Sequence, residues 1–90
     1  MTRLDWSIRP RRSPADDVNL VADGGIVYDP GRDRVHYLNH TAVLLLELCT
    51  GQVEAAELPR LLQAAYDLPE PPLTDVAGYL EKLLEEGLVH

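Results

Sequence analysis

The chain has 90 residues, of which 46% are hydrophobic, and it carries a formal net charge of −7. A chain of this length builds one small domain and buries only about 60% of the surface that its unfolded form exposes, so a large enclosed active site is disfavoured. Nucleic-acid binding requires a surplus of cationic side chains, and beyond residue 47 the basic residues are reduced to Arg60 and Lys82.

The N-terminal half is predicted to contain an arm and a small sheet. Residues 1–17 hold prolines and arginines with little periodicity and are predicted to form an extended arm, whereas residues 18–90 form the domain. Three short apolar runs follow at 18–22, 26–28 and 34–38. Because Gly-rich or Pro-Gly turns separate them, we predict an antiparallel three-stranded sheet with the third strand at an edge.

Two helices are predicted next, at 40–50 and 55–66. Asn39 can cap the first helix because its side-chain oxygen can accept from a free N–H of the first turn. Gly51 supplies a residue that tolerates positive φ at the other end. Pro59 fits a helix only in its first turn, so the second helix is expected to begin late or to be kinked there.

A third helix is predicted after the prolines at 69–72, with Thr74 as its N-cap and Gly87 at its end. Its apolar residues fall on one stripe. The two residues after Gly87, Leu88 and Val89, are expected to fold back. A sheet followed by three helices makes the fold class α+β.

Candidate catalytic and metal-binding residues are few. Cys49 is the sole cysteine and lies among leucines, which favours a buried thiol over a nucleophile. His36 and His40 are four residues apart across a strand-to-helix junction, where the helical spacing of metal ligands does not apply. The adjacent Glu85 and Glu86 are expected on a solvated face. The sequence therefore predicts no enzyme, no metal site and no cofactor.

The chain shows no run of apolar residues that could span a bilayer and no charged-then-apolar signal segment. A disulfide framework is also absent, since only one cysteine is present. We therefore expect a soluble, cytoplasmic protein.

The third predicted strand, residues 34–38, would expose unpaired backbone groups at the edge of the sheet. Arg34 and His36 could serve to blunt this edge against association. Alternatively, the edge stays open and takes up a peptide as an added strand, with main-chain hydrogen bonds supplying affinity and side-chain pockets supplying specificity. The apolar stripe of the third helix would then form the second wall of a groove as well as part of the core.

Four stretches of sequence follow one another in a characteristic order: GIVYDP at 25–30, YLNHTA at 37–42, LELCTG at 46–51 and the C-terminal segment 75–89. Together they resemble the PqqD-like family of peptide chaperones. These domains recognise the leader peptides of ribosomally made, post-translationally modified peptides. The resemblance covers nearly the whole chain from residue 8 onward.

The resemblance implies a winged helix-turn-helix-like fold and a non-catalytic chaperone. Such a protein binds the leader as a strand beside its third β-strand and against its third helix, and presents it to a separate modifying enzyme. The partners implied are thus a precursor peptide and an enzyme, with neither nucleic acid nor membrane, and the protein is a monomer or a homodimer, including a strand-swapped one. The peptide-binding residues carried over from the family are Arg34, Val35, His36, Tyr37, Leu38, Val76, Tyr79, Leu80 and Leu83.

Two alternatives belong to other functional classes. A winged-helix transcriptional regulator would use the third helix on DNA, but that helix carries Glu81, Glu85 and Glu86 against Lys82, which is the wrong sign for a phosphate backbone. A small enzyme based on Cys49 is disfavoured by the apolar residues around that thiol.

Overall fold

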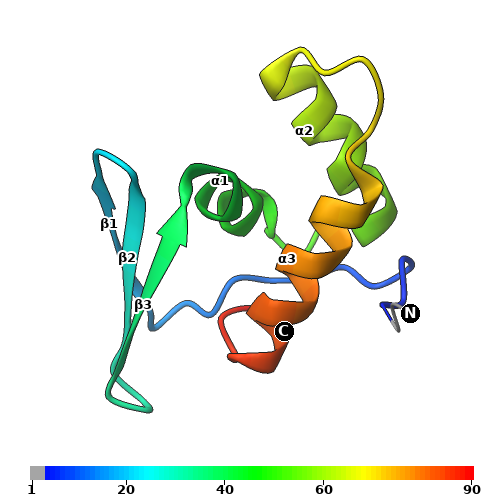
Figure 1. Ribbon diagram of the computed structural model, residues 1–90. Coiled ribbons are helices and arrows are strands. Elements are labelled where there is room, and N and C mark those ends of the chain that lie inside the picture. Colours follow the sequence, from blue (N-terminus) through cyan, green and yellow to red (C-terminus); the bar gives the residue numbers. More distant parts are fainter. Residues whose placement is uncertain (1–3) are drawn as a thin grey trace.

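A computed structural model describes residues 4–90 of the chain. Its strands are β1 (Asp17–Val21), β2 (Gly24–Asp29) and β3 (Arg34–Asn39), and its helices are α1 (His40–Leu48), α2 (Leu58–Tyr66) and α3 (Leu73–Glu85). A short 3₁₀ helix, Ala55–Glu57, leads into α2. The sheet stands on one side of the molecule and the helices on the other, with α1 between the sheet and the other two helices (Figure 1). The predicted α+β class and order of elements are confirmed.

The sheet is an antiparallel meander in the order β1-β2-β3, so both β1 and β3 are edge strands. Val27 in the middle of β2 is fully buried and pairs with Val18 on one side and His36 on the other. Because side chains alternate between the two faces of a strand, this row defines the inner face, toward the helices. On β3 the residues of that face are Arg34, His36 and Leu38.

The β1–β2 turn is tighter than predicted. It consists of residues 22 and 23 alone, and both Gly24 and Gly25 belong to β2. Gly25 is needed for packing rather than for the turn, because a Cβ there would lie 2.8 Å from a methyl carbon of Val43 on α1. The missing side chain lets α1 approach the sheet closely.

Asn39 caps α1 as predicted, since its Oδ1 accepts a hydrogen bond of 2.9 Å from the backbone N–H of Ala42. The helix ends at Leu48, however, two residues before the predicted end. The reason lies in the N-terminal segment. Thr50 forms a β-bridge with Arg11, which takes the chain out of the helical path before Gly51 is reached.

The start of α2 agrees with the constraint from Pro59, which lies in the first turn of that helix and follows the 3₁₀ helix. The predicted cap of α3 is wrong. Thr74 lies inside the first turn, and the N-cap position belongs to Pro72, whose carbonyl already accepts from the N–H of Val76 at 3.0 Å. The helix starts earlier because that carbonyl makes the first intrahelical bond.

The core is built mainly from leucine and valine of β2, the three helices and the C-terminal residues. Its largest fully buried side chains include Leu45, Leu46, Leu58, Leu62, Leu80, Leu88, Val27, Val76 and Val89. Burying one such side chain stabilises the fold by about 1.5–3 kcal/mol. One side of the apolar stripe of α3 is therefore buried in the core.

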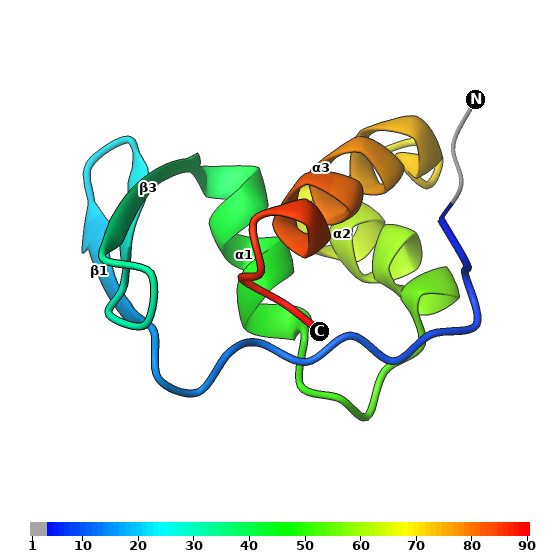
Figure 2. The same cartoon turned by 90° about the horizontal axis from the view of Figure 1, so that it is seen from below.

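The segment before β1 runs along the helices beside the C-terminal residues (Figure 2). Arg12 forms a β-bridge with Val89, so the residues after α3 fold back as expected. Trp6 and Ile8 pack against the core from this segment. The predicted arm began at residue 1, and residues 1–3 lie outside the described part of the chain. No helix among the described residues is long and apolar enough to cross a membrane.

Candidate functional site

A groove with a volume of about 380 Å³ lies between β3 and α3. No Cα atom of β3 comes within 8 Å of a Cα atom of α3, so the two elements stand apart while α1 packs against both. The residues that line the groove are Val35, His36, Tyr37, Leu38, Asn39, Ala42, Tyr79, Lys82, Leu83, Glu86 and Leu88. Its floor is apolar, and its charged side chains come from β3 and from the C-terminal part of α3.

The β3 wall is the free edge of the sheet. Among the described residues no strand pairs with β3 on the side away from β2. The side chains of Val35 and Tyr37 are 50% and 80% exposed and belong to the outer face, so they border the groove along the edge of the strand. Leu38 and His36 belong to the inner face and point toward α1 and α3.

The α3 wall is a single helical face. Tyr79, Lys82, Leu83 and Glu86 follow one another at spacings of three, one and three residues, which places them on one side of a helix. The polar ends of Lys82 and Glu86 therefore stand over an apolar base formed by Leu83 and the ring of Tyr79.

The structure separates the predicted contact residues into two groups. Val35, His36, Tyr37, Leu38, Tyr79 and Leu83 line the groove, and Arg34 lies beside its charged end. Val76 and Leu80 do not line it. Both are 0% exposed because they occupy the core side of the α3 stripe, so we no longer regard them as residues that touch a peptide. Val76 and Leu80 instead pack α3 onto the core.

Asn39 joins the two walls at one end of the groove. Its Nδ2 donates a hydrogen bond of 2.9 Å to the hydroxyl oxygen of Tyr79, while its Oδ1 caps α1. One side chain thus connects the end of β3, the start of α1 and the middle of α3. The sequence identified Asn39 only as a cap, since the contact with Tyr79 spans 40 positions of the chain.

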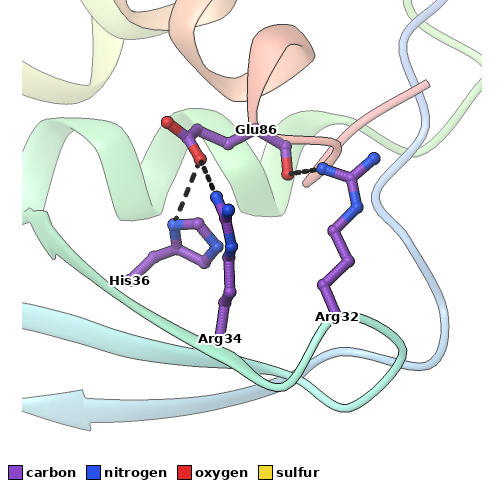
Figure 3. Close-up of polar contacts among 4 residues, drawn as sticks. All are labelled: Arg32, Arg34, His36 and Glu86. Carbon is purple, nitrogen blue, oxygen red and sulfur yellow. Dashed lines mark hydrogen bonds and ion pairs between the residues drawn. The ribbon is translucent and has the colours of Figure 1, made fainter.

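Glu86 closes the other end. Of the two glutamates predicted on a solvated face, Glu85 is exposed, whereas Glu86 is only partly exposed because it turns toward β3. Its side chain is 34% exposed, and its Oε2 lies 3.9 Å from Nη1 of Arg34 and 3.8 Å from Nδ1 of His36 (Figure 3). Arg32 in the β2–β3 turn donates from Nη1 to the backbone carbonyl of Glu86 at 3.1 Å. Cations are favoured here because free carbonyls make the C-terminus of a helix electronegative.

Gly87 makes room for this arrangement. Its φ of +72° is in the left-handed region, and a Cβ at this position would lie 2.9 Å from Nη2 of Arg32. A side chain would therefore be strained and would push the guanidinium away from the end of α3. The terminating glycine of the helix also admits the arginine that covers that end.

Among residues 4–90, two buried polar atoms have no hydrogen-bond partner, namely Oδ2 of Asp16 and Nε2 of His36. Burial raises the pKa of Asp16, and the nearby charge of Asp29 raises it further, while His36 and Arg12 act in the opposite direction. The folded protein therefore stabilises the carboxylate of Asp16 less well than the unfolded chain does.

The thiol of Cys49 lies in the core, away from the groove. Burial raises the pKa of Cys49 to about 12, so the thiol is protonated at neutral pH and is a weak nucleophile. No group of three or more His, Cys, Asp or Glu residues in the described part of the chain could hold a metal ion.

The fold and the groove define a small α+β domain with one sheet edge left open beside a helix. The sequence matches the family model described as Coenzyme PQQ synthesis protein D (PqqD) over residues 24–89, and the chain belongs to this family. The match begins with β2 and ends at Val89, so it includes both walls of the groove. Comparison with curated proteins and with solved structures gave no match.

The predicted family is thereby confirmed. PqqD proteins are non-catalytic accessory proteins in the biosynthesis of a peptide-derived cofactor. The family is one of peptide-binding proteins that act on ribosomally made precursors together with a modifying enzyme.

Proposed function

We propose that this protein is a peptide chaperone. It binds the leader of a ribosomally made precursor peptide as an additional strand beside β3, and it presents the rest of the precursor to a separate modifying enzyme. Because the precursor must be met soon after synthesis, the cytoplasm is the compartment that suits this role.

The observation that carries the proposal is the open edge of β3 beside the α3 wall. An added strand lies about 4.7–4.9 Å from its neighbour, and its main chain takes up the unpaired N–H and C=O groups of the edge. The Cα atoms of α3 stay more than 8 Å from those of β3, which leaves space for the inward side chains of such a strand.

The lining of the groove suits a peptide. Every second side chain of an added strand points toward the helices, where Leu38, Leu83 and Leu88 offer apolar contact. The exposed edge supplies sequence-independent affinity, and these side chains add specificity. Cys49, with its protonated thiol in the core, takes no part, so the chemical step belongs to the partner enzyme.

The direct test is a calorimetric titration of the protein with the leader segment of a precursor peptide encoded beside its gene. The expected result is a one-to-one complex, with a scrambled leader of the same composition giving no heat of binding. A titration with duplex DNA at low salt serves as the control for the regulator alternative. Absence of leader binding, or equal binding of the scrambled peptide, would contradict the proposal.

A further inference from the structure

We propose that the groove selects leader peptides carrying an acidic side chain four residues away from an apolar anchor. In this assignment Arg34 contacts the acidic side chain, with Arg32 and Lys82 adding positive charge. The inference rests on the proposed function and names the chemistry of the peptide that the groove prefers.

The first argument is the charge at the Glu86 end of the groove, which differs in sign from the protein as a whole. The chain carries a net charge of −7, yet Arg34 lies beside the carboxylate of Glu86 and Arg32 beside its backbone carbonyl (Figure 3), while Lys82 lines the groove one helical turn before Glu86. Glu81 and Glu85 of α3 do not line the groove. An incoming segment therefore meets a surplus of positive charge at this end.

The second argument is that the cations are only partly used. The Arg34–Glu86 contact of 3.9 Å is longer than the 2.7–2.9 Å or so that is typical of a charge-assisted hydrogen bond. The side chain of Arg34 is 63% exposed, so its remaining donors face solvent. Among the described residues no carboxylate lies within ion-pair distance of Lys82. Arg32 donates to a backbone carbonyl, which carries no formal charge, so this contact does not neutralise the guanidinium.

Two carboxylates near the turn, Asp29 and Asp33, are already engaged on other sides of the strand. Asp33 accepts a hydrogen bond from the hydroxyl of Tyr28, which belongs to the outer face of the sheet. Asp29 pairs across the sheet with Arg34 but is buried, and its Oδ1 accepts from the backbone N–H groups of Gly31 and Arg32. Its charge is thus held by the turn on the β2 side, away from the edge where a strand would add. A carboxylate on that strand could reach the guanidinium of Arg34 from the open side.

The spacing follows from the geometry of β3. Leu38, His36 and Arg34 occupy successive inner-face positions, so the apolar and cationic ends of the wall are four residues apart. Cross-strand neighbours interact in pairs, so a side chain beside Leu38 should be apolar and one beside Arg34 should be acidic. The acidic residue follows the anchor in an antiparallel complex and precedes it in a parallel one.

A basic side chain at the same position is the alternative, and among the described residues that line the groove Glu86 is the carboxylate it would meet. It would also compete with Arg34 and His36 for that carboxylate and would stand close to the guanidinium groups of Arg34 and Arg32. Like charges at this range disfavour the complex. Arginine, in contrast, presents a planar fork that holds a carboxylate through two parallel hydrogen bonds.

The experiment is a selection of random twelve-residue peptides displayed on phage against the 90-residue protein. The same library is selected against Arg34→Glu, against Lys82→Glu, and against Arg60→Glu as a matched charge reversal on the exposed face of α2. Thermal melts of the four proteins establish that each is folded. If Arg34→Glu does not fold, Lys82→Glu takes its place in the test. An enriched peptide is then synthesised with its acidic residue and with the corresponding amide.

The expected result is enrichment of an acidic residue four positions from an apolar one by the wild type and by Arg60→Glu. Selection on Arg34→Glu should lose this preference or replace it with a basic one, and the amide peptide should bind the wild type roughly tenfold more weakly. Enriched peptides without this acid, or with the same acid on Arg34→Glu, would overturn the inference and leave strand addition intact. No enrichment by the wild type would overturn the proposed function itself.

Discussion

The two edge strands of the sheet expose the same kind of unpaired backbone but differ in what lies beside them. No Cα atom of β1 comes within 8 Å of a Cα atom of a helix, and Leu20 of β1 is 73% exposed on the inner face. β3 packs against α1, and α3 stands across a groove from it. In Figure 1, β1 is the strand farthest from the helices and β3 the nearest.

The difference indicates what turns an edge into a binding site. Backbone groups alone cannot choose a peptide, because every edge strand offers them. A second wall supplies pockets for alternate side chains and, here, a charged end. We therefore expect peptide binding at β3 and none at β1, and each of the following predictions tests that contrast.

The largest effect is expected from Leu38, which has a matched partner on the other edge. Leu38 and Leu20 flank Gly25 in one row of the sheet, so both lie on the same face. Leu38→Asp places a charge on the apolar floor of the groove and should weaken leader binding by more than about tenfold. Leu20→Asp should leave the affinity unchanged, as measured by calorimetry.

Because Leu38 is partly buried, its replacement by Asp also costs stability. Leu38→Ala with Leu20→Ala provides a milder pair, and thermal melts identify any variant that is unfolded at the temperature of the titration. Equal losses of affinity for the two edges would contradict the account.

A smaller effect is expected from the hydrogen bond between Asn39 at the end of β3 and Tyr79 of α3. Tyr79→Phe removes the acceptor for Nδ2 of Asn39 and should lower the free energy of unfolding by about 1 kcal/mol. Leader affinity should fall a few-fold because the two walls are less firmly held. Tyr28→Phe, which removes a hydrogen bond to Asp33 on the outer face, is the control. Loss of affinity in the control alone would contradict the prediction.

The smallest effect concerns Asp16, which leads into β1. Its pKa is raised in the folded protein, so the folded state holds this proton more firmly and the carboxylate costs stability at neutral pH. Asp16→Asn should therefore raise the free energy of unfolding at pH 7 by less than about 1 kcal/mol, with the gain shrinking as the pH falls toward 4. Denaturant melts at both pH values, with Asp17→Asn as control, test this, and a gain that grows in acid would refute it.

Much of this fold could be predicted from local patterns. Turn residues between short apolar runs predict the meander, and the spacing of leucines predicts three helices. The cap at Asn39 and the early position of Pro59 in α2 follow from rules that act within one turn of helix. The β3 edge was predictable for the same reason, since a meander leaves its last strand unpaired on one side.

Contacts between distant segments account for what was missed. The end of α1 depends on a bridge between Thr50 and Arg11, and the role of Glu86 depends on cations more than 50 positions earlier. Burial likewise divides one apolar stripe into groove residues such as Leu83 and core residues such as Leu80. A helical repeat counted from Tyr79 would have found Lys82 and Glu86, which share its face.

The central claim, that a peptide adds to β3 and not to β1, is tested most directly by amide hydrogen exchange measured residue by residue with and without the leader peptide. In an edge strand every second N–H points outward, so binding should slow exchange at alternate residues of Arg34–Asn39 and leave Asp17–Val21 unchanged. Protection that appears in β1, or a complex that leaves the amides of β3 unprotected, would contradict the account.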